Sequence, residues 1–200
     1  MDVCAVSARD PARPLLESHP FASLLCFTLE RALSHGLDDW SFFGKTYFWS
    51  FVRHLSDCLP STSSIIHSVS AATSSPCGRG RVFLRVLLNE RAMAECLSAL
   101  VWNVPLVSKH YRPTALLRRD EDAAIFLLLL ENLNGVTFSL ATPDPLLDDP
   151  DYWSKLPSLH IPRRTVLQNA GEDCVVLCVC GVCVCYICAA SRCVCVCVCV

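Results

Sequence analysis

Two groups of basic side chains are the residues of this sequence with the clearest potential to bind a partner. The first basic group comprises Arg79, Arg81 and Arg85, and the second comprises Lys109, Arg112, Arg118 and Arg119. Arg81 and Arg85 are four residues apart, so they share one helix face, which we expect to lie opposite an apolar stripe. If the helices that carry the two groups pack as antiparallel neighbours, the groups form one positive surface.

The chemistry of such a surface leaves three interpretations open. Arginine suits bidentate contacts with the carboxylates of an acidic protein surface. A phosphate or a phosphoinositide head group is a second candidate ligand. Without a partner, the same side chains would form the solvated face of a helix.

No combination of residues typical of an active site accompanies these groups. The sequence has no P-loop, no G-x-G-x-x-G, no G-x-S-x-G and no H-E-x-x-H. Its histidines are not in ligand spacing with one another or with cysteine. Acidic residues 120–122 suit a helix N-terminus, and residues 148–151 lack the glycine and the closing glutamate of an EF-hand. We therefore expect a non-enzymatic protein without a cofactor, a metal or a small-molecule substrate.

Composition narrows the class of protein further. The chain has 200 residues, enough for one domain, and a formal net charge of −2, which provides no overall field to attract nucleic acid. Cys26 and Cys96 fall within apolar helical patterns, where a thiol behaves as a small buried hydrophobe. This usage favours a reduced, cytoplasmic chain over a disulfide framework. We find no signal peptide and, before residue 174, no apolar run long enough to span a bilayer.

The C-terminal segment 174–200, called here the Val/Cys tail, ends in "CVCVCVCV". A (GT)n dinucleotide repeat encodes this alternation, so we interpret the tail as a gene-model artefact. Three other interpretations compete with this one. A metal-thiolate site is disfavoured by the stiff valines, and the apolar stretch 175–190 falls short of the roughly 20 residues of a membrane anchor. Strands that are apolar on both faces would be an aggregation hazard.

The elements that must position the basic groups are predicted to be helices, with little strand. We expect helices at 19–35, at 46–58, at a short stretch around 65–69, within the long periodic stretch 78–103, at one or two turns near 105–111, and from 120 to about 134. Ser18 is the expected N-cap of the first helix and Gly36 its C-terminal cap. The run Ile125–Leu130 is apolar all round, which predicts a helix at the centre of the core. The fold class that follows is an all-α bundle of about six to eight helices.

Several ordered blocks of the sequence resemble RUN domains. "GRGRVFLRVLLNERAMAECLSAL" is similar to the central helix block of that family, in which Gly-Arg-x-Arg is followed by aromatic-Leu-Arg. "LERALSHGL", "FWSFVRHL" and "VSKHYRPTALLRRDEDAAIFLLLLENLNGVTFSL" resemble its other blocks. One departure is Val82-Phe83, where many members have Ala-Trp. The resemblance covers residues 18–160 and implies a disordered N-terminus at 1–17 and a linker at 161–173.

The resemblance implies an α-helical adaptor domain that binds a small GTPase of the Rab, Rap or Arf-like groups in its GTP-bound state. It implies a cytoplasmic protein, peripheral to endosomal or lysosomal membranes, whose membrane association is indirect. In some members the basic residues of the Gly-Arg-x-Arg block help to hold the GTPase, which carries over to Arg79, Arg81 and Arg85. The alternative is a phosphoinositide-binding or scaffold module without a GTPase partner.

Overall fold

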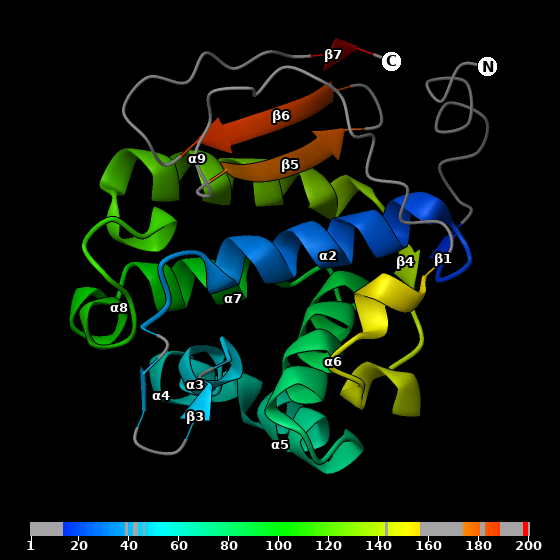
Figure 1. Ribbon diagram of the computed structural model, residues 1–200, viewed down its shortest axis with the longest axis horizontal. Coiled ribbons are helices and arrows are strands. Elements are labelled where there is room, and N and C mark those ends of the chain that lie inside the picture. Colours follow the sequence, from blue (N-terminus) through cyan, green and yellow to red (C-terminus); the bar gives the residue numbers. More distant parts are fainter. Residues whose placement is uncertain are drawn as a thin grey trace.

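Eight α-helices, α2 to α9, dominate the described part of the chain in a computed structural model (Figure 1). The structure describes residues 14–38, 40–41, 44–45, 47–142, 144–156, 174–180, 183–188 and 198–199. The α-helices are α2 (Pro20–Ser34), α3 (Trp49–Val52), α4 (Leu55–Cys58), α5 (Ser63–Ala72), α6 (Pro76–Asn89), α7 (Met93–Val101), α8 (Val104–His110) and α9 (Asp120–Glu131). The predicted all-α bundle of six to eight helices is confirmed.

Short 3-10 helices and strands connect and flank these helices. The 3-10 helices are η1 (Pro60–Thr62), η2 (Leu116–Arg118), η3 (Asn132–Gly135), η4 (Pro145–Asp148) and η5 (Tyr152–Lys155). The strands are β1 (Leu15–Leu16), β2 (Trp40–Ser41), β3 (Gly44–Lys45), β4 (Phe138–Ser139), β5 (Cys174–Cys180), β6 (Cys183–Cys188) and β7 (Val198–Cys199). β1 pairs in parallel with β4, whereas β2 with β3 and β5 with β6 are antiparallel pairs.

The first long helix, α2, confirms the predicted helix at 19–35 but not its predicted N-cap. His19 rather than Ser18 caps the helix, because its Nδ1 accepts a hydrogen bond of 3.2 Å from the backbone N–H of Phe21. Gly36 follows the helix with φ +66°, a conformation that favours glycine. A Cβ at this position would also lie 2.5 Å from the Cβ of Ala115, so two independent constraints require glycine here.

Two predicted helices are each divided in the structure. The predicted helix at 46–58 is α3 and α4, which break at Arg53 and His54. The periodic stretch 78–103 is α6 and α7, which are joined through Arg91 at φ +55°. There the N–H of Ala92 bonds to the carbonyl of Leu87 and that of Arg91 to Leu88, the Schellman pattern that ends a helix. Glycine usually occupies this left-handed position. Because arginine occupies it here, the sequence pattern did not indicate the break between the two helices.

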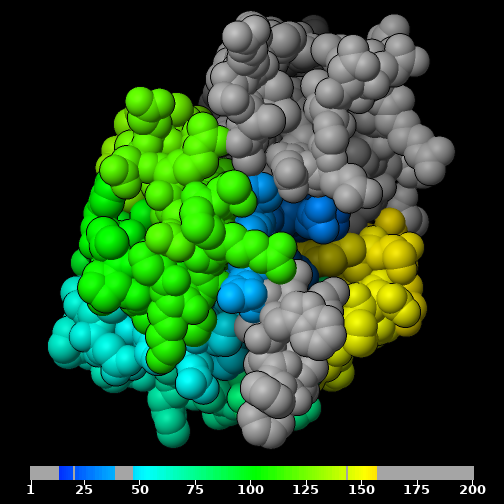
Figure 2. All heavy atoms as spheres, turned by 60° about the vertical axis from the view of Figure 1, so that its left-hand side comes forward, coloured from blue at the N-terminus to red at the C-terminus, as the bar shows by residue number. Residues whose placement is uncertain are grey.

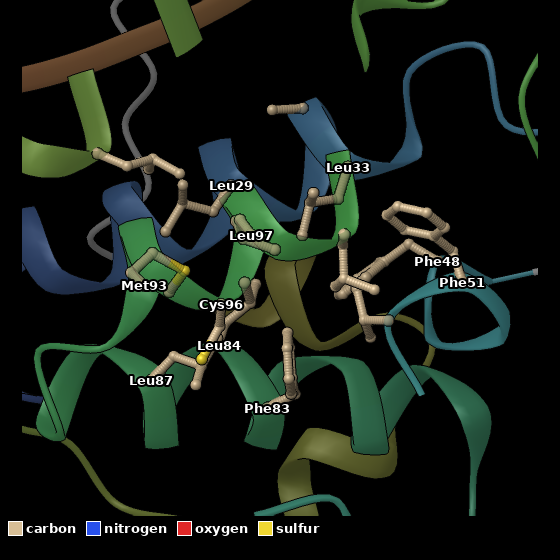
Figure 3. Packing of buried hydrophobic residues seen from close by; sticks show 14 of the residues in the cluster. Leu29, Leu33, Phe48, Phe51, Phe83, Leu84, Leu87, Met93, Cys96 and Leu97 are labelled. Atoms are coloured by element: carbon tan, nitrogen blue, oxygen red, sulfur yellow. The ribbon is translucent and has the colours of Figure 1, made fainter. Parts of the chain in front are cut away.

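The core lies where α2, α3, α6 and α7 meet (Figure 3). The labelled buried side chains are Leu29, Leu33, Phe48, Phe51, Phe83, Leu84, Leu87, Met93, Cys96 and Leu97. Cys26 and Cys96 are both buried among apolar neighbours, which confirms their predicted role as small hydrophobes. These packed helices determine where the backbone positions of the basic residues lie.

The helix α9 lies at the edge of this core rather than at its centre, so the prediction from its apolar run is wrong. Phe126 and Leu130 are buried against α7 and η2, but Ile125 and Leu128 are exposed to solvent. The backbone of α9 begins at Asp120, with Arg119 as the capping residue. The apolar run therefore includes residues of a buried face and residues of an exposed face of the same helix. Periodicity does not distinguish the two faces when every residue is apolar.

The segments on either side of the helices belong to the fold. Residues 144–156 contain η4 and η5, where Leu147 and Tyr152 are buried. Leu15 and Leu16 pair with β4, although the sequence placed them in a disordered N-terminus. Residues 1–13 and the predicted linker at 161–173 lie outside the described residues.

In the Val/Cys tail the described residues form strands. β5, β6 and β7 make an antiparallel sheet, and β5 lies alongside α2 (Figure 1). Within the described residues, no helix has the length and apolar character needed to cross a membrane. The interpretation of the tail as a translated repeat stays a prediction.

Candidate partner-binding surface

The side chain of Arg81 is buried inside the fold, with 2% of its surface exposed. Its Nε donates to Oε2 of Glu30 on α2 at 2.9 Å. Its Nη1 donates to the backbone carbonyls of Leu147 at 2.9 Å and Asp149 at 2.6 Å. One guanidinium therefore joins α6 both to α2 and to the segment that contains η4.

Arg85, one turn further along α6, has no exposed surface. Its Nη2 donates to Oε1 of Glu17 at 2.8 Å and to the hydroxyl of Tyr152 at 3.0 Å. Burial acts to lower the pKa of Arg85, but Cys26 and the hydrogen-bonded Glu17 carboxylate outweigh it and raise the pKa above its usual value. Arg85 therefore stays charged, as the buried half of an ion pair whose acidic half is partly exposed.

Two aromatic side chains of η5 cover the pair formed by Arg81 and Arg85, called here the arginine pair. The guanidinium of Arg81 lies 5.4 Å from the ring centroid of Tyr152 and 5.5 Å from that of Trp153, within cation–π range. The indole N–H of Trp153 donates to Glu30 at 2.7 Å. The expected solvent-facing position of Arg81 and Arg85 is therefore wrong, because carboxylates and carbonyls from distant segments satisfy both guanidiniums inside the protein.

The two glycines beside these arginines have a packing role. A Cβ on Gly80 would lie 2.6 Å from Cζ of Phe48, and one on Gly78 would lie 2.2 Å from Oδ1 of Asp148. Both contacts are too close for a side chain. The two glycines of "GRGR" thus allow Phe48 and Asp148 to approach the backbone of α6 closely.

Asp148 closes the start of α6. Its Oδ1 accepts a hydrogen bond of 3.1 Å from the backbone N–H of Ser75. The same oxygen accepts hydrogen bonds from the hydroxyl groups of Ser75 and Thr73. Ser75 is itself the N-cap, accepting from the N–H of Gly78 at 3.0 Å. Burial acts to raise the pKa of Asp148, but the hydrogen bonds outweigh it and hold the pKa below its usual range. The Asp148 carboxylate thus occupies the N-terminus of α6. The partial positive charge of a helix N-terminus attracts anions, so a free anion would otherwise bind there.

Arg79 is the member of the first basic group that reaches the surface. It is half-buried, and its Nε donates to the carbonyl of Thr73 at 3.1 Å. It lines a shallow depression of about 540 Å³ together with the acidic residues Asp144 and Asp148. The two carboxylates offset its charge locally, so Arg79 is a weak centre for an anionic ligand.

The second basic group lies on α8, η2 and the start of α9. Lys109 and Arg112 are exposed, whereas Arg118 and Arg119 are half-buried. Nη1 of Arg118 donates to the carbonyl of Tyr111 at 3.1 Å, and Arg119 forms an ion pair of 3.1 Å with Asp122. Lys109 and Arg112 are therefore the cations of this group that face solvent most openly.

The end of α2 positions this group. The backbone N–H of Arg112 donates to the carbonyl of Gly36 at 2.8 Å, and that of Leu116 donates to Nδ1 of His35 at 3.0 Å. Figure 2 turns this side forward and shows the green residues of α7 to α9 directly next to the cyan residues of α3 and α4, with blue residues exposed beside the green ones. The connection that carries the second basic group is thus fixed by backbone contacts.

The two basic groups do not form the single positive surface that was predicted on the condition of antiparallel packing. α6 packs against α2, α3 and α5, whereas α8 packs against α3, α7 and η2. α7 packs against both α6 and α9 and separates them. Figure 1 shows α8 at one side of the molecule and the start of α6 beside α5.

Arg53 is a cation of this side that sequence analysis did not single out. It is exposed at the end of α3, close enough to His110 on α8 to affect its titration. Burial, then His54, Lys109 and Arg53, lower the pKa of His110 to about 4. His110 is therefore neutral near pH 7, and Arg53, Lys109 and Arg112 supply the positive charge. The break between α3 and α4, which exposes Arg53, gave no signal in the sequence.

Metal-binding groups and reactive thiols are two features of the described residues that bear on chemistry. Among them, no group of three or more histidine, cysteine, aspartate or glutamate side chains could hold a metal ion. Burial raises the pKa of the Cys26 thiol to about 11, despite the opposing effect of Arg85, so this thiol stays neutral and a poor nucleophile. The arrangement suits binding through surface side chains.

Comparisons with known proteins agree with this architecture. The family model described as RUN domain matches residues 24–143. Protein RUFY3 of Homo sapiens is 33% identical over 112 residues, which are 54% of this chain and 24% of that protein. Pleckstrin homology domain-containing family M member 2 of Mus musculus is 28% identical over 178 residues, covering 86% and 17% of the two chains.

A third relative, RUN and FYVE domain-containing protein 2 of Pongo abelii, is 29% identical over 147 residues, 71% of this chain and 24% of that protein. The chain thus spans about a quarter or less of the length of these curated relatives. The matched region contains α6 with its arginine pair and α8 with the second basic group. This chain belongs to the RUN-domain family.

Proposed function

We propose that this chain is a non-enzymatic adaptor domain that binds a small GTPase of the Rab, Rap or Arf-like groups in its GTP-bound state. Membership of the RUN-domain family is the observation that carries this proposal. The adaptor acts in endosomal or lysosomal trafficking, and its membrane association is indirect, through the GTPase.

The exposed part of the second basic group is the proposed contact surface. Lys109 and Arg53 are exposed and both lie near His110, and Arg112 is exposed two residues after His110, so three cations are available to carboxylates of a partner. Arg118 and Arg119 flank them as half-buried residues that support the connection. Arg79 is a separate, weaker contact at the far end of α6.

The arginine pair has an indirect role in this proposal. Arg81 and Arg85 hold α6 against α2 and η5, and a partner has no access to guanidiniums that are almost fully buried. Reversing their charge would therefore abolish binding by unfolding the domain, not by removing a contact. Exposed residues are the informative positions to change.

The test compares charge reversals on the full chain under reducing conditions. The variants Lys109→Glu and Arg112→Glu are incubated with purified Rab, Rap and Arf-like GTPases loaded with a non-hydrolysable GTP analogue or with GDP. The matched control is Lys155→Glu, since Lys155 is an exposed cation on η5 whose surface ion pair with Asp149 contributes little to stability.

We expect nucleotide-dependent binding by the wild type and by Lys155→Glu, and loss of binding by the other two variants with native circular dichroism. Failure of the wild type to bind any GTP-loaded member of the panel would overturn the proposal. Flotation with phosphoinositide vesicles covers the alternative: lipid binding that ignores the nucleotide state favours a lipid-binding module.

A further inference from the structure

The corner between α7 and α8 exposes two large apolar side chains. Trp102, which follows α7, has 53% of its surface exposed, and Val104, which begins α8, has 64%. The neighbouring Leu100, Val101 and Val107 are buried in the core. The backbone beneath the exposed side chains is therefore held firmly, and the corner presents them in a fixed position.

Hydrogen bonds reinforce the corner. The backbone N–H of Val104 donates to the carbonyl of Trp102 at 3.1 Å. Oδ1 of Asn103 accepts from the N–H of Leu106 at 3.2 Å, and Nδ2 of the same residue approaches Sγ of Cys58 at 3.3 Å. Such a preformed apolar surface binds a partner without a large cost of ordering side chains and backbone.

The register of α8 places the apolar and cationic side chains on one face. Val107 is buried, whereas Val104, Pro105, Ser108 and Lys109 are all exposed. Pro105 and Lys109 are four residues apart, so their Cβ atoms are about 6 Å apart on the same side of the helix. The exposed face of α8 thus runs from an apolar end at Val104 and Pro105 to a positive end at Lys109, and the exposed Trp102 lies two residues before the apolar end in the chain.

The charges around this face define the chemistry of its occupant. Arg53 and Lys109 are exposed and both act on the titration of His110 at its positive end, and the exposed Arg112 follows two residues after His110 in the chain. The nearby carboxylates are those of Asp57, hydrogen-bonded to Nδ1 of His54 at 2.9 Å, and of the exposed Asp38, whose backbone N–H donates to the carbonyl of His110 at 2.8 Å; the three cations outnumber them. An apolar centre beside exposed cations is complementary to an apolar patch bordered by carboxylates.

A second exposed apolar pair provides a comparison. Ile125 and Leu128 on α9 are exposed to a similar degree, with Leu128 at 61%. The exposed charged residues on the same helix are all acidic: Asp120, Glu121 and Glu131. An acidic partner is therefore repelled from α9 and attracted to α8, so charge distinguishes the two surfaces.

We propose that Trp102 and Val104 are the apolar anchor through which this domain docks on an acidic surface of its GTP-loaded small GTPase, with Lys109 and Arg112 as the charged rim. This inference rests on the proposed function and names the part of the domain that carries the binding energy. Tryptophan at the centre of an interface is among the residues whose truncation weakens binding most.

The test measures affinity of the full chain for the GTP-analogue-loaded GTPase that binds the wild type in the panel. The variants are Trp102→Ala and Val104→Ser, and the matched controls are Ile125→Ser and Leu128→Ser. Because all four side chains are about half exposed or more, each variant should retain the thermal midpoint of the wild type within a few degrees.

Trp102→Ala is expected to weaken binding about tenfold or more and Val104→Ser by a smaller factor, with the controls unchanged. Wild-type affinity in both α8 variants, or an equal loss in the α9 controls, would overturn the inference and leave the proposed function standing. Absence of any GTPase binding by the wild type would instead overturn the proposed function, and the inference with it. If Trp102→Ala unfolds, Val104→Ser decides the outcome.

Discussion

The arginine pair on α6 and the cations on α8 use the same charge in opposite ways. Arg81 and Arg85 lie inside the protein and bind carboxylates and carbonyls of their own chain. Lys109 and Arg112 face solvent and leave their charge available to another molecule. A sequence pattern can place a cationic residue on a helix. Only its contacts with distant parts of the chain determine whether that residue lies in the core or at an interface.

The chemistry of arginine explains why arginine rather than lysine occupies the two buried positions of the arginine pair. A planar guanidinium has five N–H donors and binds a carboxylate and carbonyls at once, which the compact ammonium of lysine does less well. An intact buried ion pair adds little net stability, but removal of one partner leaves unsatisfied groups in the interior. Substitutions at the two surfaces should therefore have very different effects on stability.

The largest expected effect comes from breaking the arginine pair. We expect Arg81→Met to lower the free energy of unfolding by about 3 to 5 kcal/mol, because two backbone carbonyls lose a donor and Glu30 loses its cationic partner. Arg112→Met, its exposed counterpart, should change it by less than about 0.5 kcal/mol. Urea denaturation measures both, and equal losses would show that the comparison is wrong.

A smaller effect is expected at the glycine that lets the arginine-bearing helix approach the core. Gly80→Ala places a Cβ 2.6 Å from the buried ring of Phe48, and such overpacking costs about 1 to 3 kcal/mol. Gly135→Ala is the control, since no atom lies within 4 Å of the added Cβ. Thermal unfolding of the two variants should differ clearly; an unchanged midpoint in Gly80→Ala would contradict close packing at α6.

The start of α6 provides a pH-dependent version of the comparison. The pKa of Asp148 is lowered in the folded state, so its contribution to stability is present above its unfolded pKa and is lost as pH falls below about 4. Asp148→Asn should cost about 1 kcal/mol near pH 7, typical of a lost helix cap, and less in acid. Urea titrations at several pH values measure the free energy of unfolding of both proteins. A difference between the two proteins that does not change with pH would count against an ionised Asp148 at the start of α6.

A second pH-dependent effect is expected at His110, beside exposed cations. Burial and the adjacent His54 lower its pKa to about 4, so between pH 6.5 and 4 the unfolded chain binds a proton that the folded domain does not. Wild-type stability should therefore fall across this range, and His110→Gln should make the fall shallower. Parallel slopes for the two proteins in chemical denaturation would indicate that His110 protonates freely in the folded domain.

Local patterns in the sequence were sufficient for the helical architecture. Apolar spacing and the glycine at position 36 located α2, and the apolar contexts of Cys26 and Cys96 identified them as core residues. These features depend on neighbours within one or two turns. The break at Arg91 was missed because the left-handed position holds arginine where glycine is usual.

The candidate site depended on contacts that no local pattern contains. Arg81 meets a carboxylate 51 residues away, and Arg85 meets one 68 residues away, so their burial follows from the tertiary fold. The paired glycines at 78 and 80 were the available signal, because bare backbone on a helix indicates close packing. The sequence did identify Lys109 and Arg112 as surface cations, and their exposure is observed.

The contacts of Arg85 also determine where the domain can be cut. Glu17 precedes the region matched by the family model and Tyr152 follows it, yet both bind the same guanidinium. A piece trimmed to residues 24–143 would retain Arg85 without its carboxylate or its phenol, and a buried cation would be left unneutralised. A trimmed piece should therefore keep at least residues 17 to 152, because Glu17 and Tyr152 contact each other's segment through Arg85.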